Sequence, residues 1–327
     1  MSGGVLVVGA GSLGSVYGAR LAQGGAGVQL YAREEHARAI EAAGGVVVER
    51  GDKAELVPLR AEWRPDRVEP AATVIVLTKA PDTASALAGL EHVRGGIELA
   101  VSLQNGVEKD DVLARWCGAD AVVGGVSMVG GTLLEPGRVA HTFDGGTILG
   151  ELPRGTSERV ERLAAALAAG GLTAVVSDDV RAVEWAKLVH ASPTMAVPAL
   201  VRLPLHACLT SEPLAALYVT LVREGIAVAA AEGIEVDDGP VGYPLRQIAS
   251  APDDEAVALV RERGRALEAA GMTEIRVSML QSIERGRRTE VDAIHGFLVR
   301  EAARLGIDAP ATTLCHRLLA GIDERLA

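Results

Sequence analysis

The first fourteen residues of this chain constrain its fold more than any other stretch. Residues 5–8, Val-Leu-Val-Val, form an uninterrupted apolar run of the kind found in strands buried on both faces. Gly9, Gly11 and Gly14 follow at the spacing Gly-x-Gly-x-x-Gly. The first glycine permits a tight turn, the second lets a pyrophosphate approach the backbone, and the third lets the next helix pack closely on the strand. The stretch therefore predicts a strand–turn–helix unit that can hold a dinucleotide.

A helix is expected directly after this turn, over residues 12–23. Its N-terminal amides and the positive end of its dipole would face the phosphates of a bound dinucleotide. Glycines also occur in ordinary turns, but this set lies between a strand and a helix at the start of the chain, as the motif requires. The predicted cofactor-binding residues of the turn are Gly9, Ala10, Gly11, Ser12, Leu13 and Gly14.

The bulk composition argues against several other classes of protein. With 327 residues, the chain is long enough for about two domains with cores of their own. Its net charge of −11 disfavours binding to nucleic acid or anionic lipid, and its apolar runs end before they reach membrane-spanning length. The three cysteines are scattered, as is typical of a reducing compartment, and no signal peptide is recognisable. We therefore expect a cytoplasmic protein without nucleic-acid or membrane partners.

Two halves with different patterns follow along the chain. Up to about residue 176, apolar strands alternate with helices, and strand patterns without intervening helices between residues 121 and 151 indicate antiparallel additions to the sheet. From residue 177 onward, only helical patterns remain. The predicted fold class is an α/β Rossmann domain (1–176) followed by an all-α substrate and catalytic domain (177–327). Strands are expected at residues 5–8, 28–31, 46–49, 53–57, 74–77, 97–103, 121–129, 138–143, 147–151 and 172–176, and the main later helices at 157–169, 211–232, 253–270, 278–305 and 312–325.

The end of the second strand bears on the type of cofactor. An NAD enzyme normally has an acid there for the ribose hydroxyl, whereas a 2′-phosphate prefers an arginine. The strand at residues 28–31 is followed by Ala32 and Arg33, and a guanidinium forms a planar, charge-assisted fork to a phosphate. Glu34 and Glu35 follow at once, and Arg33 could be an ordinary solvated side chain. We favour NADP over NAD on this pattern.

Two further polar residues follow predicted strands, at the sheet edge where ligands of open α/β sheets bind. Lys79 comes after the strand at 74–77 and can reach a cofactor or substrate. Asn105 follows the strand at 97–103 and offers an amide that both donates and accepts hydrogen bonds. The alternatives are a surface lysine at the start of a helix and an Asn-Gly pair that only makes a turn.

The helical half contains its own candidates. Lys187 lies among apolar residues, and partial desolvation would let it act as an acid near neutral pH. The alternative is a lysine whose stem packs while its ammonium reaches water. Further on, a break at Arg285-Gly286 precedes a helical run with Glu290 and Asp292 near its start, where either acid could line a cleft or, as the residues alone favour, cap the helix.

Taken together, these motifs resemble those of the ketopantoate reductase (2-dehydropantoate 2-reductase) family. The resemblance rests on the N-terminal glycine motif, Arg33, Thr78-Lys79-Ala80, Gln104-Asn105-Gly106, Lys187-Leu188, Ser278-Met279-Leu280-Gln281 and the segment from Gly286 through Thr289-Glu290-Val291-Asp292 to Gly296. It implies a Rossmann domain joined to a helical domain like that of 6-phosphogluconate dehydrogenase, with NADPH in the cleft between them. The implied reaction is reduction of ketopantoate to pantoate, a step of pantothenate biosynthesis.

The same resemblance implies roles for individual residues. Lys187 resembles the general acid that protonates the developing alkoxide, and Glu290 the acid that orients the lysine or the substrate hydroxyl. Ser278 and Asn105 resemble substrate-binding groups; Lys79 resembles a cofactor-side group, and Asn105 is also expected near the cofactor. The chemistry agrees, because hydride transfer to a ketone builds negative charge on oxygen and a nearby cationic donor stabilises it.

The chain departs from the family pattern one and two turns after Lys187. The family usually carries asparagines there that hold the substrate, whereas this chain has Ala191 and Met195, which cannot hydrogen-bond in the same way. The departure suggests a changed, more apolar substrate. His190 and Ser192 could compensate from neighbouring positions, so His190 is kept as a candidate substrate-binding residue beside the alternative of a packed core histidine.

Other functions and partners are weighed against this interpretation. The same chemistry could act on a different small carbonyl compound or an imine, and a non-catalytic dinucleotide-binding sensor could use the same fold. Lys187, Ser278 and Glu290 argue against a sensor, which needs none of them. Histidines and cysteines show no metal-ligand spacing, so no metal is predicted. The expected partners are a small 2-oxo acid or related carbonyl compound and, since the family includes dimers, a second copy of the chain.

Overall fold

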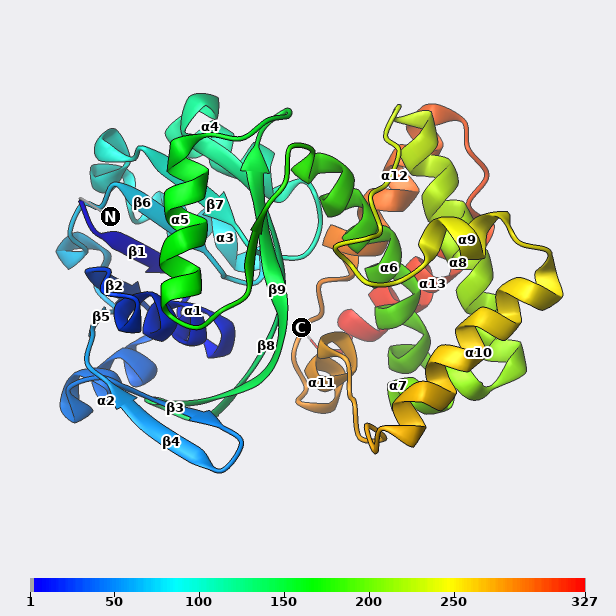
Figure 1. Ribbon diagram of the computed structural model, residues 1–327, viewed down its shortest axis with the longest axis horizontal. Helices are drawn as coiled ribbons and strands as arrows, with labels where there is room; N and C mark the ends of the chain where they lie inside the picture. Colours follow the sequence, from blue (N-terminus) through cyan, green and yellow to red (C-terminus); the bar gives the residue numbers. More distant parts are fainter. Residues whose placement is uncertain (1–2, 327) are drawn as a thin grey trace. The chain divides into compact units, whose positions relative to one another are not determined.

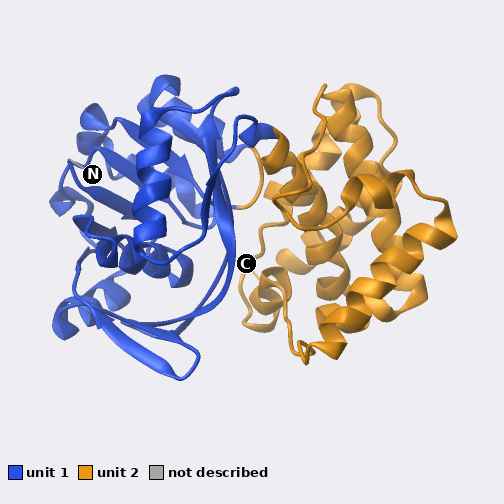
Figure 2. Ribbon diagram, in the orientation of Figure 1, with its two compact units in different colours: residues 1–104, 108–181 blue, residues 105–107, 182–327 orange. Residues whose placement is uncertain are grey.

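The computed structural model describes residues 3–326, which divide into two compact units. Unit 1 comprises the chain up to Gln104 together with Glu108–Arg181, and unit 2 comprises Asn105–Val107 together with the chain from Ala182 onward (Figure 2). The predicted boundary at 176/177 lies close to this division. The prediction placed the short segment Asn105–Val107 in the Rossmann domain, whereas in the structure it belongs to the helical unit.

Unit 1 is built on a 10-stranded sheet with the order β4-β3-β9-β8-β7-β6-β1-β2-β5, and β10 pairs with β9 (Figure 1). Strands β7, β6, β1, β2 and β5 are parallel to their neighbours, and the order reverses on either side of β1. Such a reversal is where open α/β sheets bind ligands. The strands are β1 (Val5–Val8), β2 (Val28–Tyr31), β3 (Val46–Arg50), β4 (Lys53–Val57), β5 (Arg60–Glu62), β6 (Thr73–Val76), β7 (Leu99–Ser102), β8 (Val122–Glu135), β9 (Arg138–Glu151) and β10 (Ala174–Val176).

The uninterrupted apolar run of β1 is explained by cores on both faces of the sheet. Val5 and Val7 join one core cluster, together with residues of α1 (Ser12–Gln23) and α5 (Glu158–Ala169). Leu6 and Val8 join the other, with residues of α3 (Ala80–Ala88) and α4 (Lys109–Cys117). The predicted Rossmann architecture is therefore confirmed. The remaining helix of the unit is α2 (Glu34–Ala43), and three short 3-10 turns lie at Pro65–Arg67, Glu91–Gly96 and Ala119–Ala121.

A buried tyrosine links α1, the helix after the glycine turn, to the sheet through hydrogen bonds. The Tyr17 hydroxyl donates to Ser127 Oγ of β8 at 2.8 Å and lies 2.6 Å from Thr147 Oγ1 of β9. Burial raises the pKa of Tyr17 to about 12, so the phenol stays protonated. These contacts hold the helix in a fixed position beneath the turn.

The antiparallel part of the sheet differs from the prediction. Three separate strands were expected between residues 121 and 151, interrupted at the glycine pairs 130–131 and 145–146, but the structure has two long strands, β8 and β9. Their pairing shifts register three times, at Ser127/Val129, Gly130/Gly131 and Leu133/Glu135. Bulges of this kind absorb an extra residue without ending a strand, and glycine tolerates the local geometry: Gly146 has φ +98°.

Unit 2 is helical, as predicted, and the described chain contains no strand after Val176. Its helices are α6 (Val180–Val201), α7 (Leu205–Thr210), α8 (Glu212–Ala231), α9 (Leu245–Ser250), α10 (Asp253–Ala269), α11 (Ser278–Glu284), α12 (Phe297–Leu305) and α13 (Pro310–Asp323), with α6 beginning in the last residues of unit 1. The helical run expected over 278–305 is interrupted after α11 and resumes with a π-helical turn, Asp292–Gly296. Gly286, at the predicted break, has φ +63°.

By its length and composition alone, one helix of unit 2 could cross a membrane. This is α8, and half of its most apolar window is buried inside the protein. Its Glu224 is buried and accepts hydrogen bonds from the first turn of α13: from Ala311 N at 2.9 Å and from Thr312 N at 2.7 Å. A carboxylate placed there is typical of a core helix that organises its neighbours.

Candidate functional site

Two of the three motif glycines are required by the protein's own backbone. Gly9 has φ +87°, and a Cβ there would lie 2.4 Å from the backbone nitrogen of Thr78. A Cβ on Gly14 would lie 2.6 Å from the carbonyl oxygen of Gly9. The turn and the close packing of α1 on β1 therefore exclude side chains at both positions.

Gly11 differs, because no protein atom explains the absence of its side chain. A Cβ there would meet nothing within 4 Å, and the residue is exposed. Gly11 is also the N-cap of α1 and supplies no side-chain cap to the first amides of the helix. Open space over the N-terminal turn fits a phosphate that accepts from those amides. Gly9, Ala10, Gly11, Ser12, Leu13 and Gly14 thus form a turn that fits the pyrophosphate of a dinucleotide.

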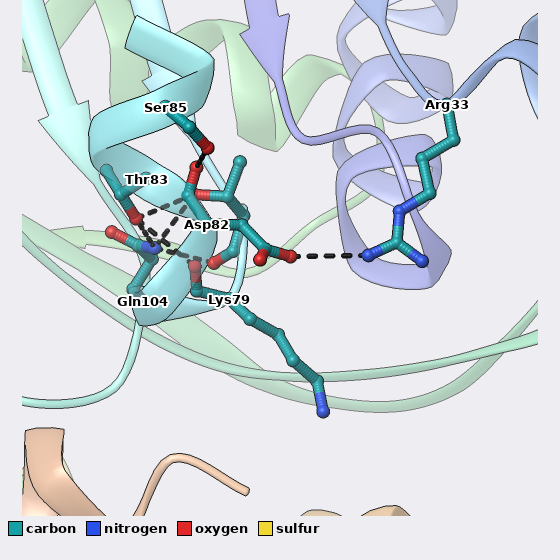
Figure 3. A network of polar contacts seen from close by, with 7 residues as sticks. Arg33, Lys79, Asp82, Thr83, Ser85 and Gln104 are labelled. Carbon is teal, nitrogen blue, oxygen red and sulfur yellow. Dashed lines mark hydrogen bonds and ion pairs between the residues drawn. The ribbon is translucent and has the colours of Figure 1, made fainter. Parts of the chain in front are cut away.

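Arg33 and Lys79 occupy equivalent places at the carboxyl ends of β2 and β6. Arg33 is the N-cap of α2 and Lys79 the N-cap of α3, and both are exposed. The Arg33 guanidinium lies 3.3 Å from Asp82 of α3, with the arginine side chain 83% exposed (Figure 3). The sequence prediction missed Asp82; the available signal was an acid in the first turn of a helix at the reversal of strand order.

A buried glutamine locks the turn that carries Lys79. Gln104 Nε2 donates to the Thr78 carbonyl at 2.6 Å and to Thr83 Oγ1 at 2.7 Å (Figure 3). Its Oε1 accepts from Ser102 Oγ at 2.8 Å. The end of β7 and the start of α3 are therefore held together by one side chain, which fixes the backbone from which Lys79 extends.

Asn105 and Glu290, which are far apart in sequence, meet in unit 2. Asn105 Nδ2 donates to Glu290 Oε2 at 3.2 Å, and both side chains are partly buried. The neighbouring Gly106 has φ +88°, and a Cβ there would lie 2.6 Å from the carbonyl oxygen of Ala293. Asn105 thus offers a specific contact to a predicted catalytic acid in addition to making a turn.

The position of Glu290 is fixed by a residue that the sequence prediction missed. Asp323, buried near the end of α13, accepts from Thr289 N at 3.0 Å and from Thr289 Oγ1 at 3.0 Å. The same hydroxyl of Thr289 accepts from Val291 N at 3.2 Å. The two residues flanking Glu290 are therefore held, and the side chain of Glu290 is left to face Asn105.

Helix capping, the role that the residues alone favoured for Glu290 or Asp292, is not what the structure shows. The π-helical turn begins without a side-chain cap, and Glu290 accepts from Asn105 instead. Asp292 Oδ1 lies 3.0 Å from His316 Nε2. The preference for capping is wrong because Thr289 already satisfies the backbone at this turn.

Lys187 lies on α6, partly buried, and the residues that follow it on the same helical face are Ala191 and Met195. Ala191 is buried, and Met195 Sδ accepts from Ser278 Oγ at 3.5 Å. Ser278, at the first position of α11, is exposed. The two positions where the family usually carries asparagine are thus apolar, and one of them contacts a predicted substrate-binding hydroxyl.

His190 lies against an aromatic ring in the helical core. Its ring centroid is 4.9 Å from that of Tyr243. Burial and, to a smaller extent, the nearby charges of Lys187 and Arg263 lower the pKa of His190 to about 4, so the imidazole is neutral at pH 7. This placement agrees with the alternative of a packed histidine, and a substrate-binding role for His190 stays a prediction. Ser192, the other proposed substitute, is fully buried, and its carbonyl oxygen lies 2.9 Å from His295 Nε2.

Residues 3–326 contain no group of three or more histidine, cysteine, aspartate or glutamate side chains that could hold a metal ion.

Comparisons with known proteins cover nearly the whole chain. The family model described as "Ketopantoate reductase PanE/ApbA" matches residues 5–154, and its C-terminal counterpart matches residues 179–323. A 2-dehydropantoate 2-reductase of Archaeoglobus fulgidus is 31% identical over 323 residues, which is 98% of each chain. A PanE/ApbA family ketopantoate reductase from Ralstonia eutropha JMP134 superposes with a TM-score of 0.82 at 31% identity, over 98% of this chain and 99% of that one. A D-mandelate dehydrogenase, solved with NADH and anilino(oxo)acetate, has a TM-score of 0.85 at 22% identity, covering 98% of this chain and 99% of that one, a likeness of fold.

Proposed function

Because this chain belongs to the ketopantoate reductase family, we propose that it is an NADPH-dependent reductase that converts a 2-oxo acid to a 2-hydroxy acid, with ketopantoate as the default substrate. The observation that carries the proposal is the grouping of Asn105 with Glu290 in the unit that bears Lys187. An oxidoreductase acting on a carbonyl group needs a proton donor and an oriented substrate, and these residues supply both. The glycine turn of unit 1 would bind the pyrophosphate of the nicotinamide dinucleotide.

When bound, a nicotinamide dinucleotide would supply the hydride that the carbonyl carbon receives. Lys187 holds a proton at Nζ and gives it to the carbonyl oxygen as negative charge develops there. Glu290, fixed by Asn105, orients Lys187 or a substrate hydroxyl, and Ser278 Oγ donates to the substrate. The net change is addition of one hydride and one proton to the C=O bond, which yields the 2-hydroxy acid.

The choice of NADPH rests on Arg33. An arginine at the end of the second strand, with no acid at that position, suits a 2′-phosphate. Its present partner is the exposed Asp82, and an ion pair between exposed side chains is worth little. A phosphate with two negative charges would displace Asp82 from the guanidinium, which makes bidentate contacts to phosphate readily. Lys79 then contributes a second positive charge on the cofactor side.

The experiment that tests this proposal measures NADPH consumption with ketopantoate, with NADH as the paired control. Lys187→Ala is expected to lower kcat about 100- to 10,000-fold, the range for loss of a general acid, with the Kd of NADPH unchanged. Lys53→Ala, an exposed lysine on β4, is the matched control and should leave kcat unchanged. An unchanged kcat in Lys187→Ala would remove this lysine from the mechanism. Tight NADPH binding with no turnover of any carbonyl compound would instead favour a dinucleotide-binding sensor.

A further inference from the structure

The face of α6 that begins at Lys187 becomes apolar immediately beyond the lysine. Ala191 follows Lys187 by four residues, on the same face of the helix. Met195 follows four residues later, beyond Pro193, a proline inside α6, and its contact with Ser278 fixes where its sulfur lies. Met195 lies about 12 Å from Lys187 along the helix axis, at 1.5 Å per residue. Ser278 Oγ donates to Met195 Sδ at 3.5 Å, so the serine lies at the far end of this face.

The other polar side chains on this part of α6 pack in the helical core. His190 packs on Tyr243, with 4.9 Å between ring centroids, and Thr194 Oγ1 lies 2.8 Å from Tyr218 Oη. Ser192 is fully buried. The side chains that follow Lys187 at intervals of four residues along α6 are therefore a methyl group, Ala191, and a thioether, Met195.

This inference rests on the proposed function. If Lys187 protonates the carbonyl oxygen and Ser278 binds the same molecule, the substrate lies along this face and contacts Ala191 and Met195. A thioether is a weak acceptor and no donor, and it packs well against apolar or aromatic groups. A hydroxyl placed on this face would lose water without gaining a partner from either side chain.

We propose that the preferred substrate is a 2-oxo acid whose side chain is apolar and carries no hydroxyl group, and that Met195 determines this preference. Ketopantoate is then a substrate but a poor one. The specificity follows from desolvation, because a site without a hydrogen-bond partner selects against the hydroxylated member of a matched pair.

The test uses two substrates that differ only in one hydroxyl group: ketopantoate and 3,3-dimethyl-2-oxobutanoate. The kcat/KM of each is measured with saturating NADPH in the full-length enzyme. We expect the deoxy compound to be favoured at least 10-fold. Met195→Asn supplies an amide beside Ser278 and should shift the ratio at least 10-fold towards ketopantoate. Met272→Asn, on an exposed methionine of the same unit, is the matched control and should not shift it.

The outcomes separate this inference from the proposed function. A wild-type preference below 10-fold for the deoxy compound, or a preference for ketopantoate, overturns the inference and leaves a 2-oxo acid reductase standing. A folded Met195→Asn variant with an unshifted ratio overturns the assignment to Met195. If the enzyme binds NADPH and reduces neither compound nor phenylglyoxylate, the proposed function fails and the inference fails with it.

Discussion

The glycine turn of unit 1 and the Glu290 turn of unit 2 are built in opposite ways. The sequence signature of the first lies within ten consecutive residues, where Gly9 and Gly14 leave no space for a side chain beside neighbouring backbone and Gly11 leaves room for a ligand. The second depends on distant partners: Asn105 is 185 residues from Glu290 in sequence, and Asp323 is 34 residues from Thr289. A site made from backbone geometry has a local signature, whereas a site held by side chains from several helices does not.

The largest expected effects come from separating the two kinds of glycine in the turn. Gly9→Ala should destabilise the protein by about 4 kcal/mol, because the left-handed φ and the contact with Thr78 force the backbone to move. Gly11→Ala should change stability by no more than about 1 kcal/mol, since its Cβ meets nothing, but weaken NADPH binding about 100-fold by filling the space for the phosphate. Thermal unfolding and cofactor titration measure the two quantities.

If the two variants changed stability and NADPH affinity to the same extent, Gly9 and Gly11 would not have different roles. If Gly11→Ala kept the wild-type Kd for NADPH, the open space at this position would not be where the pyrophosphate lies. Gly25→Ala provides a control for the φ contribution alone, since Gly25 has φ +87° with no atom within 4 Å of its Cβ.

The next effect concerns Asp323. Asp323→Leu should destabilise the protein by about 3 kcal/mol, because it leaves the buried amide and hydroxyl of Thr289 without an acceptor. Asp323→Asn keeps one acceptor and should fold, but with a kcat reduced about 10-fold and the Kd of NADPH unchanged, since the Thr289–Val291 turn then holds Glu290 less firmly. Urea unfolding and steady-state kinetics are the measurements.

Glu224 offers a matched control for Asp323. It holds the opposite end of α13 through Ala311 and Thr312, with no contact to Thr289. Glu224→Gln should lower stability to a similar degree without the loss of kcat. If the two variants lost kcat equally, Asp323 would be a general stabiliser of α13 and not a positioning residue for Glu290.

The same contrast explains how much the sequence could predict. The Rossmann sheet, the antiparallel additions and the helical half follow from apolar periodicity, and Arg33 and Lys79 could be placed at strand ends because the ends of parallel strands are local features. The contact between Asn105 and Glu290 could not be derived from either segment, because a hydrogen bond across 185 residues depends on tertiary packing. The length of β8 and β9 was mispredicted for a related reason, since bulges look like strand ends until the partner strand is known.

A further effect is the response of unit 2 to acid. Burial lowers the pKa of His190 and of His295 from 6.5 to about 4. In the unfolded chain each histidine binds a proton near pH 6.5, but the folded chain does not until about pH 4, so stability is present above pH 6.5 and is lost as pH falls. The loss at pH 5 should be about 2 kcal/mol per histidine.

This acid response can be followed in unit 2 alone. Trp185 is its tryptophan, and Trp63→Phe with Trp116→Phe removes the other two from the chain. Urea unfolding monitored by Trp185 fluorescence at pH 7 and pH 5 gives the difference in stability. His295→Gln keeps a donor for the Ser192 carbonyl but cannot take up a proton, so it should remove about half of the pH dependence. A pH dependence unchanged by this substitution would contradict the assignment.

The smallest expected effect is at Arg33. This arginine is recognisable from its place after the second strand, but Asp82 of α3 forms an ion pair with it. Arg33→Ser should raise the KM for NADPH about 10-fold and leave that for NADH nearly unchanged, because in the proposed complex only the 2′-phosphate would contact the guanidinium. Asp82→Asn should lower the KM for NADPH by a factor of about 2 to 3, as removal of an exposed ion pair is worth only a few tenths of a kcal/mol. A larger gain would mean that Asp82 opposes NADPH binding directly, and that even this locally encoded preference is set by a second, distant side chain.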